Sequence, residues 1–138
     1  GFYFNLIFDN VHLVQTTSAS EVFEQILNTG EEDVVIGISF PRYSKRTSKA
    51  MEYAGKNGSY VVAISDTVNS PIAKWADSTL IAHSDMTSFV DSLTAPLSVI
   101  NALIVAAGLR REDKVMGTLT ALEKIWDEYQ VYEKDDQK

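Results

Sequence analysis

The sequence predicts an α/β fold with a parallel sheet, for two reasons. First, continuous apolar runs of strand length occur at 33–39 (DVVIGIS) and at 60–65 (YVVAIS), and such runs are typical of strands buried on both faces of a parallel sheet. Second, segments with helical periodicity separate the strand candidates, and this alternation predicts βαβ units with right-handed connections.

The other elements follow in chain order. Ser18 is expected to open a helix, because Glu21 follows it at capping-box spacing. Ser70 and Pro71 resemble a helix start with a cap and an N1 proline. We expect the remaining elements at residues 2–8 (the end of a helix), 11–14 (strand), 18–30 (helix), 44–56 (helix), 70–76 (helix) and 78–82 (strand).

Two further helices are predicted towards the C-terminus. Residues 88–107 are almost wholly apolar, and a helix of this kind must be buried on most sides. A small sheet alone does not cover it, so we expect a homodimer or higher oligomer through this helix, with a kink at Pro96. Residues 111–132 carry an apolar seam at 4-3-4-3 spacing, typical of a C-terminal helix.

Composition excludes several classes of function. The 138 residues, 45% of them apolar, fit a single globular domain over 1–138. The chain has no Cys, which excludes disulfides, thiolate metal sites and cysteine nucleophiles. A net charge of −7 argues against nucleic-acid binding by these residues. No apolar run of 18 residues and no signal peptide occur, so we expect no membrane contact and a cytoplasmic location.

The turn at residues 39–47 is the candidate binding site. In open α/β sheets, ligands bind beyond the carboxyl ends of the strands. This turn offers three hydroxyls, three cations and a helix N-terminus, which together suit an anion. The candidate ligand-binding residues are Ser39, Arg42, Tyr43, Ser44 and Thr47. The alternative is that Ser44 is only a helix cap and that Lys45, Arg46 and Lys49 form a solvated face.

The other polar residues carry weaker signals. The loop at 65–70 fits turn chemistry and a helix cap. His12 and His83 lack the spacing of metal ligands and are interpreted as structural. No catalytic motif and no acid–base pair is evident, so we assign no catalytic residue, no metal and no cofactor.

The segment from 33 to 82 resembles a SIS (sugar isomerase) domain. The resemblance lies in a buried strand ending Ile38-Ser39, in GSYVVAIS at 58–65 and in SPIAKWAD at 70–77. The long helix SFVDSLTAPLSVINALIVA at 88–106 is also similar to the family's helix at that position. Within the family, the chain is most similar to the C-terminal effector domain of RpiR/MurR-type bacterial transcription regulators.

This resemblance implies a five-stranded parallel sheet with helices on both faces. It also implies phosphosugar binding, with the phosphate in the turn after the strand, near Ser39, Ser44 and Thr47. In the regulators, an N-terminal helix-turn-helix domain binds operator DNA, effector binding alters its affinity, and the SIS domain pairs with itself.

The chain departs from the family pattern in two respects. The family turn usually reads S-x-S-G-x-[ST], whereas Pro41 and Arg42 stand here in place of Ser and Gly. Pro41 lacks an N–H donor, and the side chain of Arg42 offers hydrogen-bond donors for an anion instead. In addition, the family's first strand, which lies centrally in its sheet, and the helix-turn-helix domain are not within these residues. We expect upstream residues, or another segment that fills the gap.

The sequence thus predicts the phosphosugar-sensing and dimerisation domain of a transcription regulator. One alternative is a sugar-phosphate isomerase or lyase on the same fold, for which His83, Asp66 and Asp85 are the weak candidates for a base. The other is a ligand-free oligomerisation domain. Which sugar binds, the sign of regulation, the operator and the effect of Pro41 and Arg42 on ligand class are not encoded in these patterns.

Overall fold

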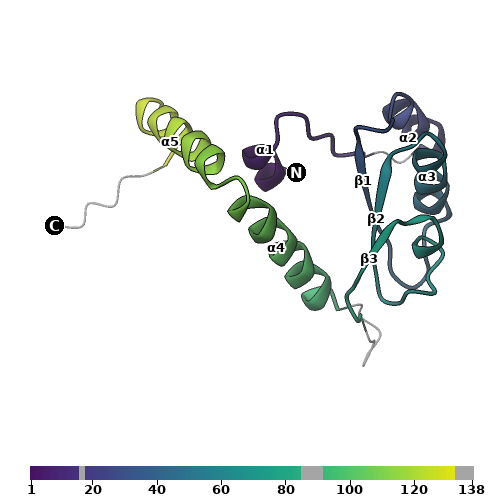
Figure 1. Cartoon of the computed structure of the whole chain (residues 1–138). Helices are drawn as coiled ribbons and strands as arrows, with labels where there is room; N and C mark the ends of the chain where they lie inside the picture. The colour runs from purple at the N-terminus through teal and green to yellow at the C-terminus, as the bar shows by residue number, and fades with distance from the viewer. Residues whose placement is uncertain (16–17, 85–91, 133–138) are drawn as a thin grey trace. The chain divides into compact units, whose positions relative to one another are not determined.

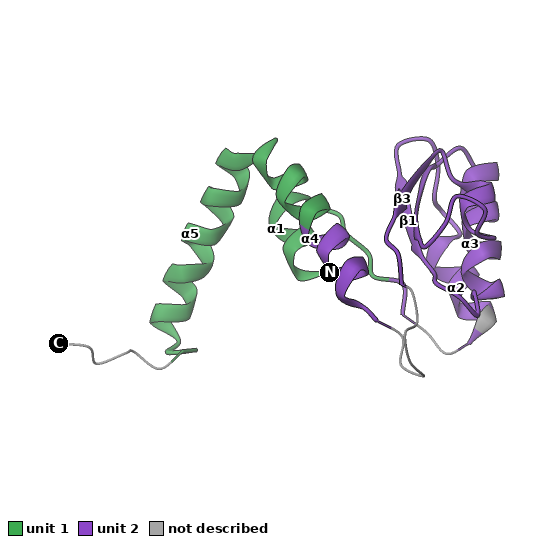
Figure 2. Cartoon of the chain, turned by 90° about the horizontal axis from the view of Figure 1, so that it is seen from below, with its two compact units in different colours: residues 1–13, 102–138 green, residues 14–101 purple. Residues whose placement is uncertain are grey.

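The structure is a computed structural model that describes residues 1–15, 18–84 and 92–132 (Figure 1). The chain divides into two compact units, coloured separately in Figure 2. One unit comprises residues 1–13 and 102–138, and the other comprises residues 14–101. Each unit is described by itself.

The unit of residues 14–101 is built on a three-stranded parallel sheet. Its strands are β1 (Val34–Ile38), β2 (Tyr60–Ser65) and β3 (Ser78–Ile81), in the order β1-β2-β3. The register pairs Ile38 with Ile64 and Ser65 with Ile81, so the strands end close to one another at the same edge of the sheet. The prediction of a parallel α/β sheet is therefore confirmed.

One side of this sheet packs against helices. These are α2 (Ala19–Ile26), α3 (Lys45–Lys56) and the short 3₁₀ helix η1 (Ala73–Trp75), and Figure 2 shows α2 and α3 on the same side. The expected helix at 70–76 is thus a single 3₁₀ turn, at which Ser70 Oγ accepts from the Ala73 N–H at 3.3 Å. The core beneath is formed by Met51, Ala54, Val61, Ala63 and Ile72.

A close approach between α3 and β1 depends on Gly37. A Cβ atom at this position would lie 2.1 Å from Sδ of Met51, which is itself fully buried. Any larger residue at 37 would push the helix away from the strand. The glycine therefore sets the distance between the helix and the sheet.

The prediction of five strands covered on both faces is corrected to three strands within the described residues. Residues 11–14 form no strand, and Leu13 and Val14 are exposed. On β1, the side chains of Val34, Ile36 and Ile38 are 63%, 38% and 47% exposed. The second face of β1, predicted to be buried, is therefore open in this unit.

The other unit is helical. It comprises α1 (Phe2–Ile7), the later residues of α4 (Thr94–Leu109) and α5 (Glu112–Glu128). Leu6 and Ile7 of α1 are buried. Lys114 of α5 forms an ion pair with Asp9, which follows α1. Apolar burial and this ion pair together join α1 to α5.

The start of α4 corrects one detail of the prediction. The helix begins at Thr94, so Pro96 lies in the first turn rather than inside the helix. Proline is tolerated there, because the first N–H groups of a helix have no intrahelical partner. Residues 88–91 of the expected helix lie outside the described residues. Over the described ranges, no helix combines the length and the apolar character needed to cross a membrane.

Replacing Gly37 by Ala tests the close approach of α3 to β1. We expect a loss of about 1–3 kcal/mol in the free energy of unfolding, because the added methyl group overpacks against Met51. Gly30→Ala is the matched control, since a Cβ there has no neighbour within 4 Å, and it should change stability by less than about 0.5 kcal/mol. Urea denaturation measures both variants, and equal stabilities would contradict the packing described above.

Candidate functional site

Ser39 closes the turn that leads from β1 into α3. Its N–H donates to the Ile64 carbonyl at 3.2 Å and so continues the ladder between β1 and β2. Its Oγ accepts from the Ser44 N–H at 3.1 Å. The residue is buried, at 7% exposure. The first predicted site residue thus shapes the turn itself.

Ser44 is the N-cap of α3, as the alternative interpretation predicted. Its Oγ accepts from the Thr47 N–H at 3.2 Å. A hydroxyl that accepts a hydrogen bond still carries its own proton. The Ser39 and Ser44 hydroxyls therefore remain able to donate to an anion at the helix N-terminus, where the helix dipole also favours negative charge. The capping role and a binding role are compatible.

Arg42 occupies an unusual backbone conformation. Its φ is +68°, in the left-handed region that residues other than glycine rarely adopt. The residue is exposed and follows Pro41, which has no N–H to offer a ligand. Such backbone strain persists only where surrounding contacts hold it. In this turn, the Ser39–Ser44 hydrogen bond closes the loop around Arg42.

Tyr43 connects this turn to the loop that follows β2. Its phenol donates to Asp66 Oδ1 at 2.8 Å, and the carboxylate raises the pKa of Tyr43 above its ordinary value. Ser65, fully buried, reinforces the connection, because its Oγ donates to the Ser39 carbonyl at 2.7 Å and lies 3.1 Å from Asp66 Oδ1. The sequence indicated two separate loops, whereas the structure joins them into one cluster.

The basic residues of α3 do not act as one group. Lys49 Nζ lies 2.7 Å from Glu52 Oε2, and Lys56 Nζ lies 2.8 Å from Oε1 of the same residue. These two hydrogen bonds lower the pKa of Glu52 to about 2. Lys49 is therefore part of an exposed ion-pair network on the helix, in agreement with the solvated-face interpretation.

The histidines show no metal-binding arrangement. His12 Nε2 lies 2.7 Å from Asn10 Oδ1, a local and exposed contact, and His83 is exposed after β3. In the part of the chain that the structure describes, no three His, Cys, Asp or Glu side chains gather as a metal site. Asp85, a weak base candidate, lies outside the described residues.

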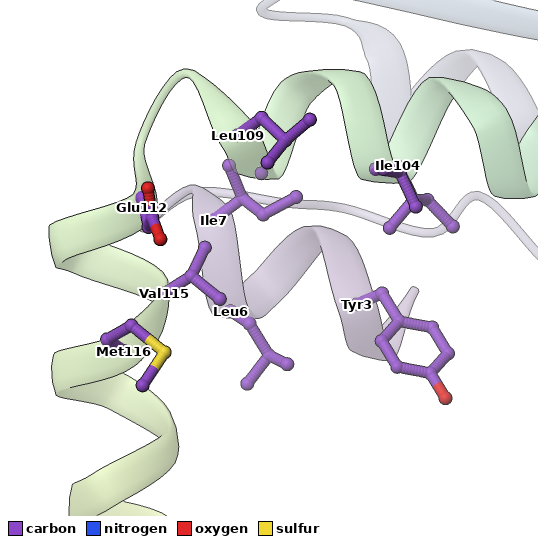
Figure 3. A pocket seen from close by; sticks show the side chains of 10 residues that line it. Tyr3, Leu6, Ile7, Ile104, Leu109, Glu112, Val115 and Met116 are labelled. Carbon is purple, nitrogen blue, oxygen red and sulfur yellow. The ribbon is translucent and has the colours of Figure 1, made fainter.

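The helical unit contains an apolar groove of about 230 Å³ (Figure 3). Only Glu112 and the Tyr3 hydroxyl bring polar atoms to its side-chain lining, so it does not suit an anion. Its lining comes from α1, α4 and α5: Tyr3, Leu6, Ile7, Ile104, Val105, Gly108, Leu109, Glu112, Val115 and Met116.

Comparison with protein families identifies the architecture. The model of the SIS domain matches residues 1–106. The chain belongs to the SIS domain family. No curated protein sequence matches it significantly.

Solved structures place this SIS domain beside those of transcription regulators. It is 25% identical to the sugar isomerase domain of an RpiR transcription factor from Sphaerobacter thermophilus, with a TM-score of 0.81 over 90% of this chain and 69% of that one. The NanR protein of Vibrio vulnificus, solved with ManNAc-6P, shares the fold at 14% identity and a TM-score of 0.71, over 90% of this chain and 49% of NanR.

A third similar structure comes from a candidate enzyme. It is a candidate phosphosugar isomerase from Bacillus subtilis, 19% identical, with a TM-score of 0.55 over 92% of this chain and 43% of that one. At this identity the likeness concerns the fold alone. The two regulators and the candidate isomerase therefore share one architecture with this chain.

The hydrogen bond from Tyr43 to Asp66 should make stability depend on pH above neutrality. The pKa of Tyr43 is raised in the folded protein, so its stabilisation is complete below the unfolded-state value of about 10 and is lost as pH rises through the folded-state value. We expect Tyr43→Phe to cost about 1 kcal/mol at pH 8. The difference from the native protein should shrink as pH rises above about 10 in urea denaturation, and a constant difference would contradict the assignment.

Proposed function

We propose that this SIS domain senses a sugar phosphate, or another anionic sugar, as the effector and dimerisation domain of a bacterial transcription regulator. The observation that carries the proposal is the closed turn between β1 and α3. It places the Ser39 and Ser44 hydroxyls beside a helix N-terminus, at the carboxyl end of a parallel strand. The likeness to regulator domains, one of them solved with ManNAc-6P, supports it.

The anionic part of the ligand binds at this turn in our proposal. Ser39 and Ser44 donate their hydroxyl protons, Thr47 and Tyr43 lie within the same turn and first helical residues, and Arg42 supplies a positive charge. Arginine offers several N–H donors in one plane and binds phosphate or carboxylate through two parallel hydrogen bonds. It replaces the backbone donor that Pro41 lacks. No cofactor and no metal take part.

Self-association is the second part of the proposal. α4 carries no charged residue, yet several of its large apolar side chains are exposed. Leu97, Val105 and Leu109 are 55%, 59% and 69% exposed, and their spacing places them within about 120° around the helix axis. This apolar stripe is the surface through which two copies of the chain pair. An exposed apolar stripe of this kind is otherwise costly in water.

Sensing then couples to DNA through the dimer. A ligand shifts an equilibrium between two arrangements only by as much as it binds one of them better. In our proposal, the occupied turn favours one arrangement of the paired domains. That arrangement biases a DNA-binding domain outside these 138 residues, so this acidic domain does not touch DNA itself.

The rival function is catalysis by a sugar-phosphate isomerase or lyase on the same fold, the fold that a candidate phosphosugar isomerase shares. Such an enzyme needs a base next to the carbonyl of the substrate. Of the residues considered, Asp66 already accepts a hydrogen bond from Tyr43, and His83 is exposed. Turnover of an aldose or ketose phosphate that is lost in His83→Ala or Asp66→Asn would favour the enzyme over the sensor.

A thermal-shift screen with sugar phosphates and sugar acids, N-acetylmannosamine 6-phosphate among them, tests the binding site. A ligand at about 100 times its dissociation constant should add about 2.7 kcal/mol of stability. Arg42→Ala and Ser44→Ala should abolish this gain, and Ser44→Ala should also cost about 1 kcal/mol through loss of the helix cap.

Lys49→Ala is the matched control for that screen. It removes one positive charge from the same helix, but Lys49 is held by Glu52, so ligand binding should be unchanged. Unaltered affinity in both Arg42→Ala and Ser44→Ala would remove the turn from the site. If no compound in the screen stabilises the protein, the ligand-free oligomerisation domain would be favoured.

Substitution within the apolar stripe tests self-association. We expect a dimer by light scattering at micromolar concentration, and a monomer after Leu97→Asp or Val105→Asp, because either change buries an unpaired carboxylate in the interface. Thr120→Asp adds the same charge to an exposed helical position of α5 and should leave the dimer intact. A monomeric native protein, or dimers of both stripe variants, would contradict this surface.

A further inference from the structure

We infer that Asp66, held by Tyr43, is the residue that selects polyhydroxylated ligands at the proposed site. This inference rests on the sugar-phosphate site proposed above and deepens it. The two loops involved are neighbours because β1 and β2 pair in parallel and end together, with Ile38 opposite Ile64. Asp66 therefore lies beside the turn that begins at Ser39.

The hydrogen bonds around Asp66 leave one carboxylate oxygen available. Oδ1 accepts from the Tyr43 phenol at 2.8 Å and lies 3.1 Å from Ser65 Oγ. Among the residues that the structure describes, none donates a hydrogen bond to Oδ2. The side chain is half-buried, so its orientation is fixed by these contacts while Oδ2 still reaches a ligand.

The cluster has a donor end and an acceptor end. At the donor end, the Ser39 and Ser44 oxygens already accept backbone hydrogen bonds, so what these hydroxyls still offer a ligand is a proton. At the acceptor end, an ionised carboxylate such as Asp66 only accepts. The Tyr43 phenol has committed its proton to Asp66 and also offers an acceptor lone pair. The two ends therefore require different chemistry from a ligand.

A fully ionised phosphate monoester does not satisfy the acceptor end. Its oxygens only accept hydrogen bonds, and a like charge close to the carboxylate is repelled. A sugar hydroxyl, by contrast, donates to a carboxylate in a charge-assisted hydrogen bond. A ligand with an anion at one end and hydroxyl groups at the other matches both parts of the cluster. A fully ionised alkyl phosphate matches only one part.

Two probes of equal charge and similar length separate these contributions. Glucose 6-phosphate carries hydroxyl groups, whereas n-hexyl phosphate carries none. If N-acetylmannosamine 6-phosphate binds more tightly than glucose 6-phosphate, N-acetylmannosamine 6-phosphate replaces glucose 6-phosphate as the hydroxylated probe. Titration calorimetry on the native protein gives the ratio of the two dissociation constants, which is the measure of selectivity for hydroxyl groups.

Asp66→Asn is the decisive variant. Asn keeps the shape of the side chain and still accepts from the Tyr43 phenol, so the fold is retained. It loses the charge that strengthens hydrogen bonds to ligand hydroxyls, and the selectivity ratio should fall about tenfold. Affinity for n-hexyl phosphate should stay equal or rise, because a repelling charge has been removed. Glu32→Gln removes a negative charge from an exposed position of the same unit and should leave the ratio unchanged.

Tyr43→Phe tests whether Tyr43 positions the carboxylate. The charge on Asp66 remains, but its Oδ1 loses the phenol that holds it. We expect the selectivity ratio to fall while affinity for n-hexyl phosphate is retained. A purely structural role of Tyr43 would weaken both probes alike and would overturn its place in the inference.

The outcomes distinguish this inference from the function on which it rests. In one outcome, both probes bind the native protein, Ser44→Ala abolishes their binding, and Asp66→Asn has the native selectivity ratio. This outcome would overturn the role of Asp66 but would leave the proposed sensor site intact. Binding of neither probe, nor of N-acetylmannosamine 6-phosphate, would overturn both. A ratio that falls in Asp66→Asn but not in Glu32→Gln would establish the selecting role.

Discussion

The parallel pairing of β1 with β2 is the constraint on which the candidate site depends. Because the register runs to Ile38 opposite Ile64, both strands end at the same level of the sheet. The residues that follow, Ser39 and Ser65, then hydrogen-bond directly, and Asp66 comes within reach of Tyr43. A shift of the register by one residue would turn these side chains to the other face of the sheet and separate the two loops.

Sequence patterns were sufficient for β1, β2 and β3 and for the turn after β1. The apolar runs at 33–39 and 60–65 predicted β1 and β2 closely, because a short, β-branched apolar run is typical of a strand in a parallel sheet, although the second face of β1 is open in this unit. Ser44 was predicted as a cap from its place before a helical pattern, and it caps α3. Local chemistry determines features of this kind, so a single sequence is enough to find them.

Features that depend on distant residues were not predictable in the same way. The bond between Tyr43 and Asp66 joins positions 23 residues apart, and nothing in either loop alone indicates it. Residues 11–14 were predicted as a strand but form none, because strand propensity depends on pairing with a neighbouring strand and a short apolar segment does not show whether one is present. The kink expected at Pro96 depended on where α4 begins, and helix boundaries follow from capping contacts rather than from periodicity.

At position 42, folding stability and the proposed anion binding favour different residues, because the backbone there is left-handed. A left-handed conformation costs an arginine about 1 kcal/mol or more, and glycine adopts it without that penalty. Laboratory evolution that selects only for heat resistance should therefore favour glycine at 42. Selection for recognition of an anion should retain the arginine despite its strain. The frequency of glycine at this position in two such selections would report, without any ligand in hand, which of the two demands the turn was shaped to meet.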